Sequence, residues 1–339
     1  MRRALIAAVL CFAAKSAHAD DLDDKDFGLR FTAALTRFAR YPDVAALGGS
    51  GGGSPWSSSP NPASCGMNSS TGPKGFGASV QYSQVYFGEG TRVHVGSLSG
   101  SYDGKASGTW QPAVVVVDTN HAETTDGLTF HWEAVGGEVQ WGLKTSCDTS
   151  IGLNLSVLHS KIDNALAGTP VSDSSSTTYD ARAGVLHKLS ESIYAGVAAE
   201  FSAAPGETVL HDYMSFGNGD QKLEDTTYGF TIRPGIYDKI SKDLSAYLDV
   251  QLARFWSDAG TLRTLRVSAG LDETVHEGIY VRGGVLFDNW GDVAPTVGIG
   301  IQPSETFMID ISYQYNLFPE IEKEFGRAHT FGIGVTLLF

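Results

Sequence analysis

The sequence predicts an all-β fold, a transmembrane antiparallel β-barrel of about fourteen strands preceded by an N-terminal plug or hatch segment. Segments of about ten residues alternate apolar side chains with polar or small ones, which is typical of strands with two unlike faces. Their length suffices for a tilted strand to cross a bilayer, which takes about 9 to 11 residues. Short and long connections alternate between these segments, and the last segment ends on Phe339.

Composition excludes several other classes of protein. The 339 residues are 42% hydrophobic and 11% aromatic, which argues against disorder. No run of 18 apolar residues is present, so helical membrane spans are excluded. The formal net charge of -14 argues against nucleic acid as a partner, because phosphate contacts need a basic surface. A mean hydropathy of -0.08 is compatible with a barrel, because alternating apolar and polar positions cancel in the average.

The N-terminus has the pattern of a secretory signal peptide over residues 1–19. Arg2 and Arg3 precede the apolar stretch 4–14, and Ala-His-Ala at 17–19 supplies small residues at the cleavage site. The mature chain then begins at Asp20 and keeps two cysteines, Cys65 and Cys147. The residues leave open whether these two form a disulfide.

Residues 20–74 do not alternate and form the predicted plug. A loosely helical stretch is followed by Gly-Gly-Ser-Gly-Gly-Gly-Ser-Pro at 48–55 and by Trp-Ser-Ser-Ser-Pro-Asn-Pro-Ala at 56–63. Such a composition indicates either a flexible tail or irregular backbone packed inside a lumen. The candidate plug and ligand-gating residues are Trp56, Asn61, Pro62 and Ala63.

The barrel is predicted over residues 75–339. Within 128–144 the apolar phase changes at Gly136 and Gly137, which suits a β-bulge or kink inside one long strand. A chain that starts and ends on one side of a membrane needs an even number of strands. One kinked strand gives fourteen in total, with twelve or sixteen as alternatives.

The connections and the aromatic residues support a membrane barrel over a soluble sandwich, whose strands are typically shorter. Links such as 188–192 and 238–243 are short, whereas 160–177, 203–225 and 317–327 are long and are expected to be external loops. Aromatic residues at strand ends are expected to form interface girdles: Tyr313, Tyr315, Phe307, Phe255, Trp256, Phe287 and Trp290.

The last segment carries the predicted assembly signal. Apolar residues occupy every second position from Phe331 to Phe339, and the chain ends on that aromatic residue. This arrangement resembles the signal that outer-membrane barrels present to the barrel-assembly machinery. The expected location is the outer membrane of a Gram-negative bacterium, with outer-membrane lipid as a partner.

The Gly/Ser-rich run that closes on Asn61-Pro62-Ala63, ahead of about fourteen strands and a terminal Phe, resembles the FadL family of outer-membrane transporters. The resemblance implies a barrel blocked by an N-terminal hatch, with a kinked strand at Gly136-Gly137 that opens a gap in the wall. It also implies passive uptake of small hydrophobic molecules, long-chain fatty acids or aromatic hydrocarbons. The chain departs from the pattern at Ser64, where typical members have glycine.

Two other functions follow from the residues. Charged side chains in the inward phase, Glu200, Asp249, Arg282 and Asp310, suit a general diffusion porin for small polar solutes. An outer-membrane enzyme is the weakest alternative, because no nucleophile and base have a recognisable spacing. No Cys/His cluster has metal-ligand spacing either, so neither a metal nor a cofactor is expected.

Overall fold

The computed structural model describes residues 29–30, 34, 42–47, 49–55, 60–67, 75–88, 90–120, 122–123, 128–211, 219–258, 260–289, 291 and 293–339. The predicted signal peptide, Trp56 and Trp290 lie outside the described residues. Among the described residues, no helix is long and apolar enough to cross a membrane.

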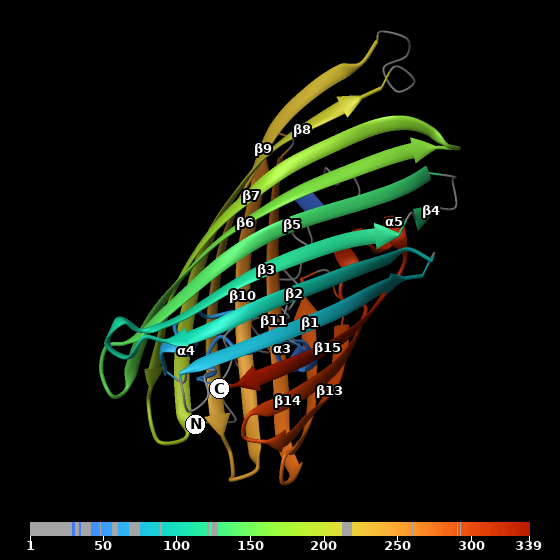
Figure 1. Cartoon of the computed structure of the whole chain (residues 1–339). Coiled ribbons are helices and arrows are strands. Elements are labelled where there is room, and N and C mark those ends of the chain that lie inside the picture. Colours follow the sequence, from blue (N-terminus) through green and yellow to red (C-terminus); the bar gives the residue numbers. More distant parts are fainter. Residues whose placement is uncertain are drawn as a thin grey trace.

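Fourteen long strands form one closed antiparallel barrel (Figure 1). They are β1 (Phe76–Phe87), β2 (Arg92–Asp103), β3 (Thr109–Asn120), β5 (Leu128–Lys144), β6 (Thr149–Leu166), β7 (Thr169–Lys188), β8 (Ile193–Leu210), β9 (Gln221–Lys239), β10 (Leu244–Ser257), β11 (Gly260–His276), β12 (Ile279–Asp288), β13 (Val293–Ser304), β14 (Phe307–Tyr315) and β15 (Ala328–Leu338). Pairing of β1 with β15 and of β3 with β5 closes the ring, so no long strand has a free edge. The predicted count of fourteen is confirmed, and residues 128–144 form one strand.

The remaining elements are short. The two-residue strand β4 (Ala122–Glu123) pairs with one end of β5. The helices within the described ranges are α3 (Pro42–Ala46), α4 (Ser64–Met67), the 3-10 turns η1 (Lys105–Ser107) and η2 (Pro319–Ile321), and α5 (Glu322–Phe325). Cys65 and Cys147 are free thiols, the first buried and the second exposed, so they do not form a disulfide.

The barrel has two unlike ends. The turn end carries tight connections, such as 145–148 and 189–192, together with Phe76 and Phe339, the first and last residues of the barrel. The loop end carries the longer connections 211–220 and 316–327. Because the strand count is even, the barrel begins and ends at the same end.

An apolar band with aromatic borders surrounds the outer face. On β1, Phe76 and Tyr86 face outward ten residues apart, which is about 34 Å along the strand and about 26 Å in height at a tilt of about 40°. Aromatic pairs mark the borders: Trp110 with Trp141 at the turn end, Tyr228 with Trp256 and Tyr313 with Phe331 toward the loop end. Phe255 does not belong to this band, because it faces inward and is 1% exposed.

The change of apolar phase in β5 has a different cause from the predicted bulge. Both ladders keep one register through Gly136 and Gly137, so no β-bulge forms there. Inward residues near the loop end are apolar because they pack in a buried cluster, as Trp132 does. Below the glycines, the apolar residues instead face outward, as Val139 does. The apolar residues of β5 therefore change from the inward to the outward face because the inward face meets the buried apolar cluster only near the loop end, while the strand itself stays regular.

Two of the predicted long loops are strands instead. β6 and β7 pair almost to their common turn at Ala167-Gly168, where both residues have positive φ (48° and 82°) as a tight hairpin turn requires. β8 and β9 likewise pair from Leu210 and Gln221 onward, and they extend well past the rest of the barrel in Figure 1. Polar stretches such as 172–176 do not alternate between apolar and polar residues, because the two faces of these hairpin ends do not differ in polarity.

Candidate functional site

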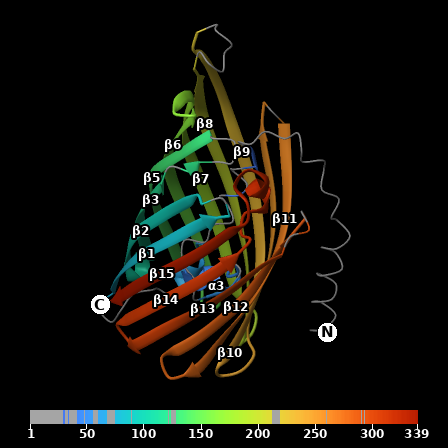
Figure 2. The same cartoon turned by 90° about the vertical axis from the view of Figure 1, so that its right-hand side faces the viewer.

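The described parts of the segment 42–67 lie inside the barrel, against the inward faces of its strands (Figure 2). The hydroxyl of Thr296 on β13 donates to the carbonyl of Ala46 (2.8 Å), and the amide of Gln314 on β14 donates to Ala45 (3.0 Å). Near α4, the hydroxyl of Ser150 on β6 donates to the carbonyl of Ala63 (2.7 Å). The segment is therefore bonded to strands on well-separated parts of the wall.

Asn61 joins the glycine-rich turn to the barrel wall. Its side chain is fully buried, and its Nδ2 donates to the carbonyls of Gly52 (2.9 Å) and Val185 on β7 (3.0 Å). Its Oδ1 accepts from the backbone N–H of Ala63 (3.0 Å). The amide thus fixes both the local turn and its attachment, which is what a buried polar side chain requires.

The structure brings three of the four predicted plug residues together. Asn61, Pro62 and Ala63 form one turn that leads into α4, where the thiol of Cys65 donates to the carbonyl of Pro62 (3.1 Å). Trp56 lies outside the described residues. A gating role for this turn stays a prediction.

Asp249 on β10 provides a second attachment. Its carboxylate is 2% exposed and accepts from the backbone N–H groups of Gly51 (2.9 Å) and Gly52 (2.8 Å). Successive N–H groups that converge on one anion form a strong, charge-assisted contact. The alternation along β10 predicts that Asp249 lies in the lumen, but it does not predict this attachment, because the partners of Asp249 are almost 200 residues away in the sequence.

Five inward glycines on neighbouring strands form a surface on which the segment rests, here called the glycine seat: Gly142, Gly152, Gly184, Gly196 and Gly235. A Cβ atom on Gly184 would lie 2.0 Å from Oδ1 of Asn61, and one on Gly152 would lie 2.3 Å from the backbone of Pro62. The Cβ positions of Gly142, Gly196 and Gly235 also fall within 2.6 Å of segment atoms. Only glycine leaves room for such close approach of two backbones.

The loop end of the lumen is apolar. The inward faces of β1, β2, β3 and β5 form a buried cluster with the β14–β15 connection. Phe325 of that connection packs 5.5 Å from Phe87 and 5.3 Å from Phe130, measured between ring centroids. A fully buried ion pair between Arg266 on β11 and Glu320 (2.7 Å) fixes the connection to the opposite wall.

The middle of the lumen is charged but internally paired. Arg182 is paired with Glu200, and Arg282 is paired with both Asp310 and Asp272. The predicted inward positions of Glu200, Arg282 and Asp310 agree with these contacts. Each of these carboxylates thus has a cationic partner in the wall.

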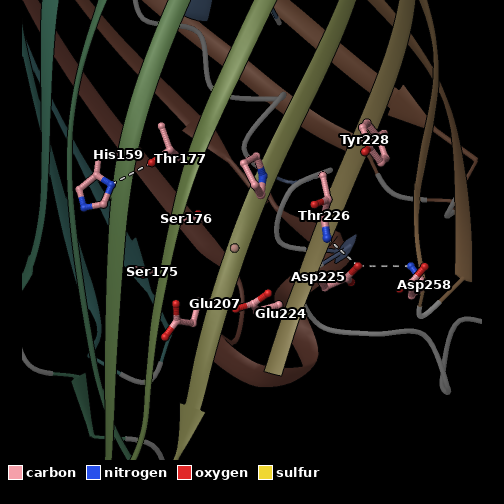
Figure 3. A pocket seen from close by; sticks show the side chains of 12 residues that line it. His159, Ser175, Ser176, Thr177, Glu207, Glu224, Asp225, Thr226, Tyr228 and Asp258 are labelled. Atoms are coloured by element: carbon pink, nitrogen blue, oxygen red, sulfur yellow. Dashed lines mark hydrogen bonds between the residues drawn. The ribbon is translucent and has the colours of Figure 1, made fainter. Parts of the chain in front are cut away.

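A polar hollow of about 560 Å³ lies among β6 to β9, toward the loop end (Figure 3). Serine and threonine side chains line it together with four carboxylates: Glu207, Glu224, Asp225 and Asp258. Lys222 is bonded to two of them, Glu207 (2.8 Å) and Glu224 (3.0 Å). This acidic lining does not suit an apolar ligand, and it shares no residue with the apolar cluster described above.

No family model matches the sequence, and no curated protein matches it. Solved structures share its fold. The monoaromatic hydrocarbon channel CymD aligns with a TM-score of 0.60 at 11% identity, and the toluene transporter TodX of Pseudomonas putida with 0.57 at 11%. A FadL homologue of Pseudomonas aeruginosa aligns with 0.57 at 13%. In each case the alignment covers 88% of this chain and 97% of the other. The chain thus has the fold of FadL homologues and of the TodX and CymD channels.

Proposed function

We propose that the protein is an outer-membrane channel for the passive uptake of small hydrophobic molecules, with its lumen closed by the segment 42–67. The observation that carries this proposal is the glycine seat, where the wall has no side chains and the segment lies directly on it. A wall shaped to hold a segment inside the lumen suits a plugged channel better than an open pore.

The fold and the apolar loop end support a hydrophobic solute. The solved structures with this fold include a monoaromatic hydrocarbon channel and a toluene transporter. In this chain the inward side chains at the loop end are apolar, and Phe87, Phe130 and Phe325 pack there in a buried cluster that an apolar solute would have to open on its way through the lumen. An aromatic hydrocarbon or a fatty acyl chain that enters the opened cluster gains about 25 cal/mol per Å² of apolar surface buried.

The outer face supports placement in the outer membrane of a Gram-negative bacterium. The apolar band of about 26 Å matches the height of the lipid-facing band of outer-membrane barrels, about 25 Å. Phe339 lies at the turn end, where its backbone N–H donates to the carbonyl of Phe76 (2.8 Å), and its side chain is 50% exposed. The aromatic side chain of Phe339 thus lies exposed at the end of the last strand, the position predicted for the assembly signal.

The test is uptake into liposomes that contain the purified mature protein. Labelled toluene and a labelled long-chain fatty acid are compared with glucose, in the full protein and in a variant that lacks residues 47–63. We expect saturable entry of an apolar solute and negligible glucose entry with the full protein, and glucose entry with the deletion variant. Apolar uptake equal to that of empty liposomes would overturn the proposal.

The porin alternative draws on the charges in the lumen, such as Arg182 and Glu200, and predicts a different electrical behaviour. A porin gives a large, steady ohmic conductance in a planar bilayer, whereas the plugged channel is expected to stay closed. Free glucose entry with the full protein would likewise favour the porin.

A further inference from the structure

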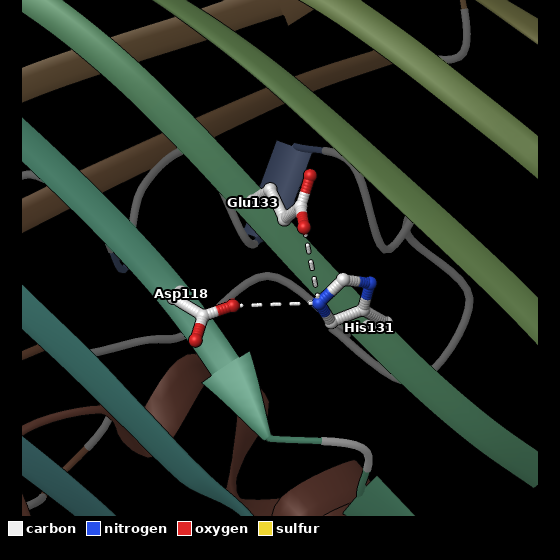
Figure 4. Close-up of side chains that lie close together, drawn as sticks. All are labelled: Asp118, His131 and Glu133. Carbon is white, nitrogen blue, oxygen red and sulfur yellow. Dashed lines mark hydrogen bonds and ion pairs between the residues drawn. The ribbon is translucent and has the colours of Figure 1, made fainter.

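We propose that Asp118, His131 and Glu133 form a binding site for a divalent transition-metal cation on the outer face of the barrel (Figure 4). Asp118 lies near the end of β3, and His131 and Glu133 lie on β5. Two positions closer to the turn end, the outward residues are Val116 and Val135, each about half exposed. The three side chains therefore occupy the first polar level beyond the apolar band.

The distances fit a metal better than they fit hydrogen bonds. Nε2 of His131 lies 3.4 Å from Oδ1 of Asp118 and 3.5 Å from Oε1 of Glu133, and the three atoms lie within 4.8 Å of one another. Ordinary N–H···O distances are about 2.7 to 3.2 Å, and one ring proton cannot serve two carboxylates well. Metal bonds of about 2.0 to 2.2 Å place tetrahedral ligands about 3.3 to 3.6 Å apart. Two of the three edges already have this length, and rotation of one exposed carboxylate shortens the third.

The charges favour a cation at the same point. Asp118 and Glu133 are direct partners in the β3–β5 ladder, so two negative side chains face each other across neighbouring strands. Like charges in that position are destabilising. Lys161, the partner of Glu133 on β6, has its ammonium group 2.9 Å from Asp163 and acts on Glu133 only through the longer-range attraction of its charge. A divalent ion between Asp118 and Glu133 would relieve the repulsion between the two carboxylates.

A further carboxylate lies on the other side of the imidazole ring. Asp163 is the ladder partner of His131 on β6, and its Oδ2 lies 3.9 Å from Nδ1. Metal-binding histidines usually direct their second ring nitrogen toward a carboxylate, which fixes the tautomer and strengthens the ligand. Asp163 lies on that side of the ring, at a distance longer than a hydrogen bond, and Nε2, which faces Asp118 and Glu133, is the nitrogen that would bind the ion.

One imidazole nitrogen and two carboxylate oxygens select the kind of ion. This donor set suits Zn²⁺ and neighbouring first-row cations better than Mg²⁺ or Ca²⁺, which prefer oxygen ligands alone. At least one coordination position would remain for water or an external donor. Local spacing in the sequence predicts no metal site, because strand pairing, and not closeness in the sequence, brings Asp118 to His131.

The test is titration of the purified protein, made without a polyhistidine tag and freed of metal with a chelator. We expect one equivalent of Zn²⁺ to bind by calorimetry, and Co²⁺ to give a visible absorption band. His131→Gln and Glu133→Gln should each weaken binding by at least tenfold and abolish the Co²⁺ band. His187→Gln, which removes an exposed histidine at the turn end, should leave both unchanged.

Two results would overturn the proposal: no saturable binding by the unaltered protein, or binding that His131→Gln leaves unchanged. Circular dichroism and the heat-dependent shift in gel mobility establish that each variant is a folded barrel. A variant that fails this check is replaced by Asp118→Asn, which is expected to weaken Zn²⁺ binding to the same degree.

Discussion

A methyl group at the centre of the glycine seat should release the proposed plug, the segment 42–67, from the barrel wall. In Gly184→Ala the new Cβ lies 2.0 Å from Oδ1 of Asn61, whereas ordinary contact begins at 3.4 Å, so the two groups must separate by about 1.4 Å. The bonds from Asn61 to Val185 (3.0 Å) and Gly52 (2.9 Å) cannot survive such a shift. Each buried hydrogen bond left unmade costs about 1 to 3 kcal/mol. The total of about 2 to 6 kcal/mol raises the population with a displaced plug at least about thirtyfold.

Cys65 reports this displacement directly. Its thiol is 1% exposed in α4, whereas Cys147 is exposed and can be replaced by serine. We expect Gly184→Ala to speed maleimide labelling of Cys65 about thirtyfold or more and to raise the conductance in planar bilayers. The control is Gly96→Ala on β2, where a Cβ would meet no atom within 4 Å. Labelling and conductance that match this control would refute the role of the glycine seat.

Three further predictions test other parts of the molecule. Asp249→Ala leaves two buried backbone N–H groups without their acceptor, so it should increase bilayer conductance, whereas Glu191→Ala in an exposed turn should not. Phe325→Ala opens a cavity in the apolar cluster and should lower stability to denaturant by about 3 kcal/mol, and an unchanged unfolding midpoint would contradict this packing. Hydrogen bonding to Asp173 (3.0 Å) raises the pKa of His211 at the loop end. The stabilisation from this contact is therefore fully present below the ordinary histidine pKa of about 6.5, and it is lost as the pH rises through the raised pKa of His211. An NMR titration should show the raised pKa, and Asp173→Asn should return it toward the ordinary value.

The strands could be predicted from the sequence because each strand must present apolar side chains on its outer face. Most outward residues in the band are apolar or aromatic, so residues such as Leu153 and Ile299 mark their strands without knowledge of the neighbours. Beyond the band this requirement ends. Residues 172–176, which pair with β8, are polar on both faces and therefore show no alternation in the sequence. In β5 the change of the apolar residues from one face to the other looks like a β-bulge in the sequence, although the register is regular.

The contacts of the segment 42–67 with the barrel wall were harder to predict from the sequence because they join distant parts of the chain. The turn at Asn61 was predicted from its composition and from the resemblance. The hydrogen bond from Asn61 to Val185 depends on the register of the strands, as do the bonds from Gly51 and Gly52 to Asp249. A single sequence does not specify that register. Inward glycines on neighbouring strands are the signal that could have revealed the seat, since a lumen without a segment has no need of them.

This difference between the two faces explains how so distant a sequence keeps the fold. The outer face requires only apolar character, which many residues supply, so identities of 11 to 13% to the solved channels are compatible with the same barrel. On the inner face, by contrast, a residue must fit the particular residue that it contacts. A larger residue at position 184 is tolerated only if Asn61 changes as well, because Oδ1 of Asn61 occupies the place of the missing Cβ. Among barrels of this fold, we therefore expect the interior contacts of the plug to vary together, whereas the lipid-facing residues vary independently.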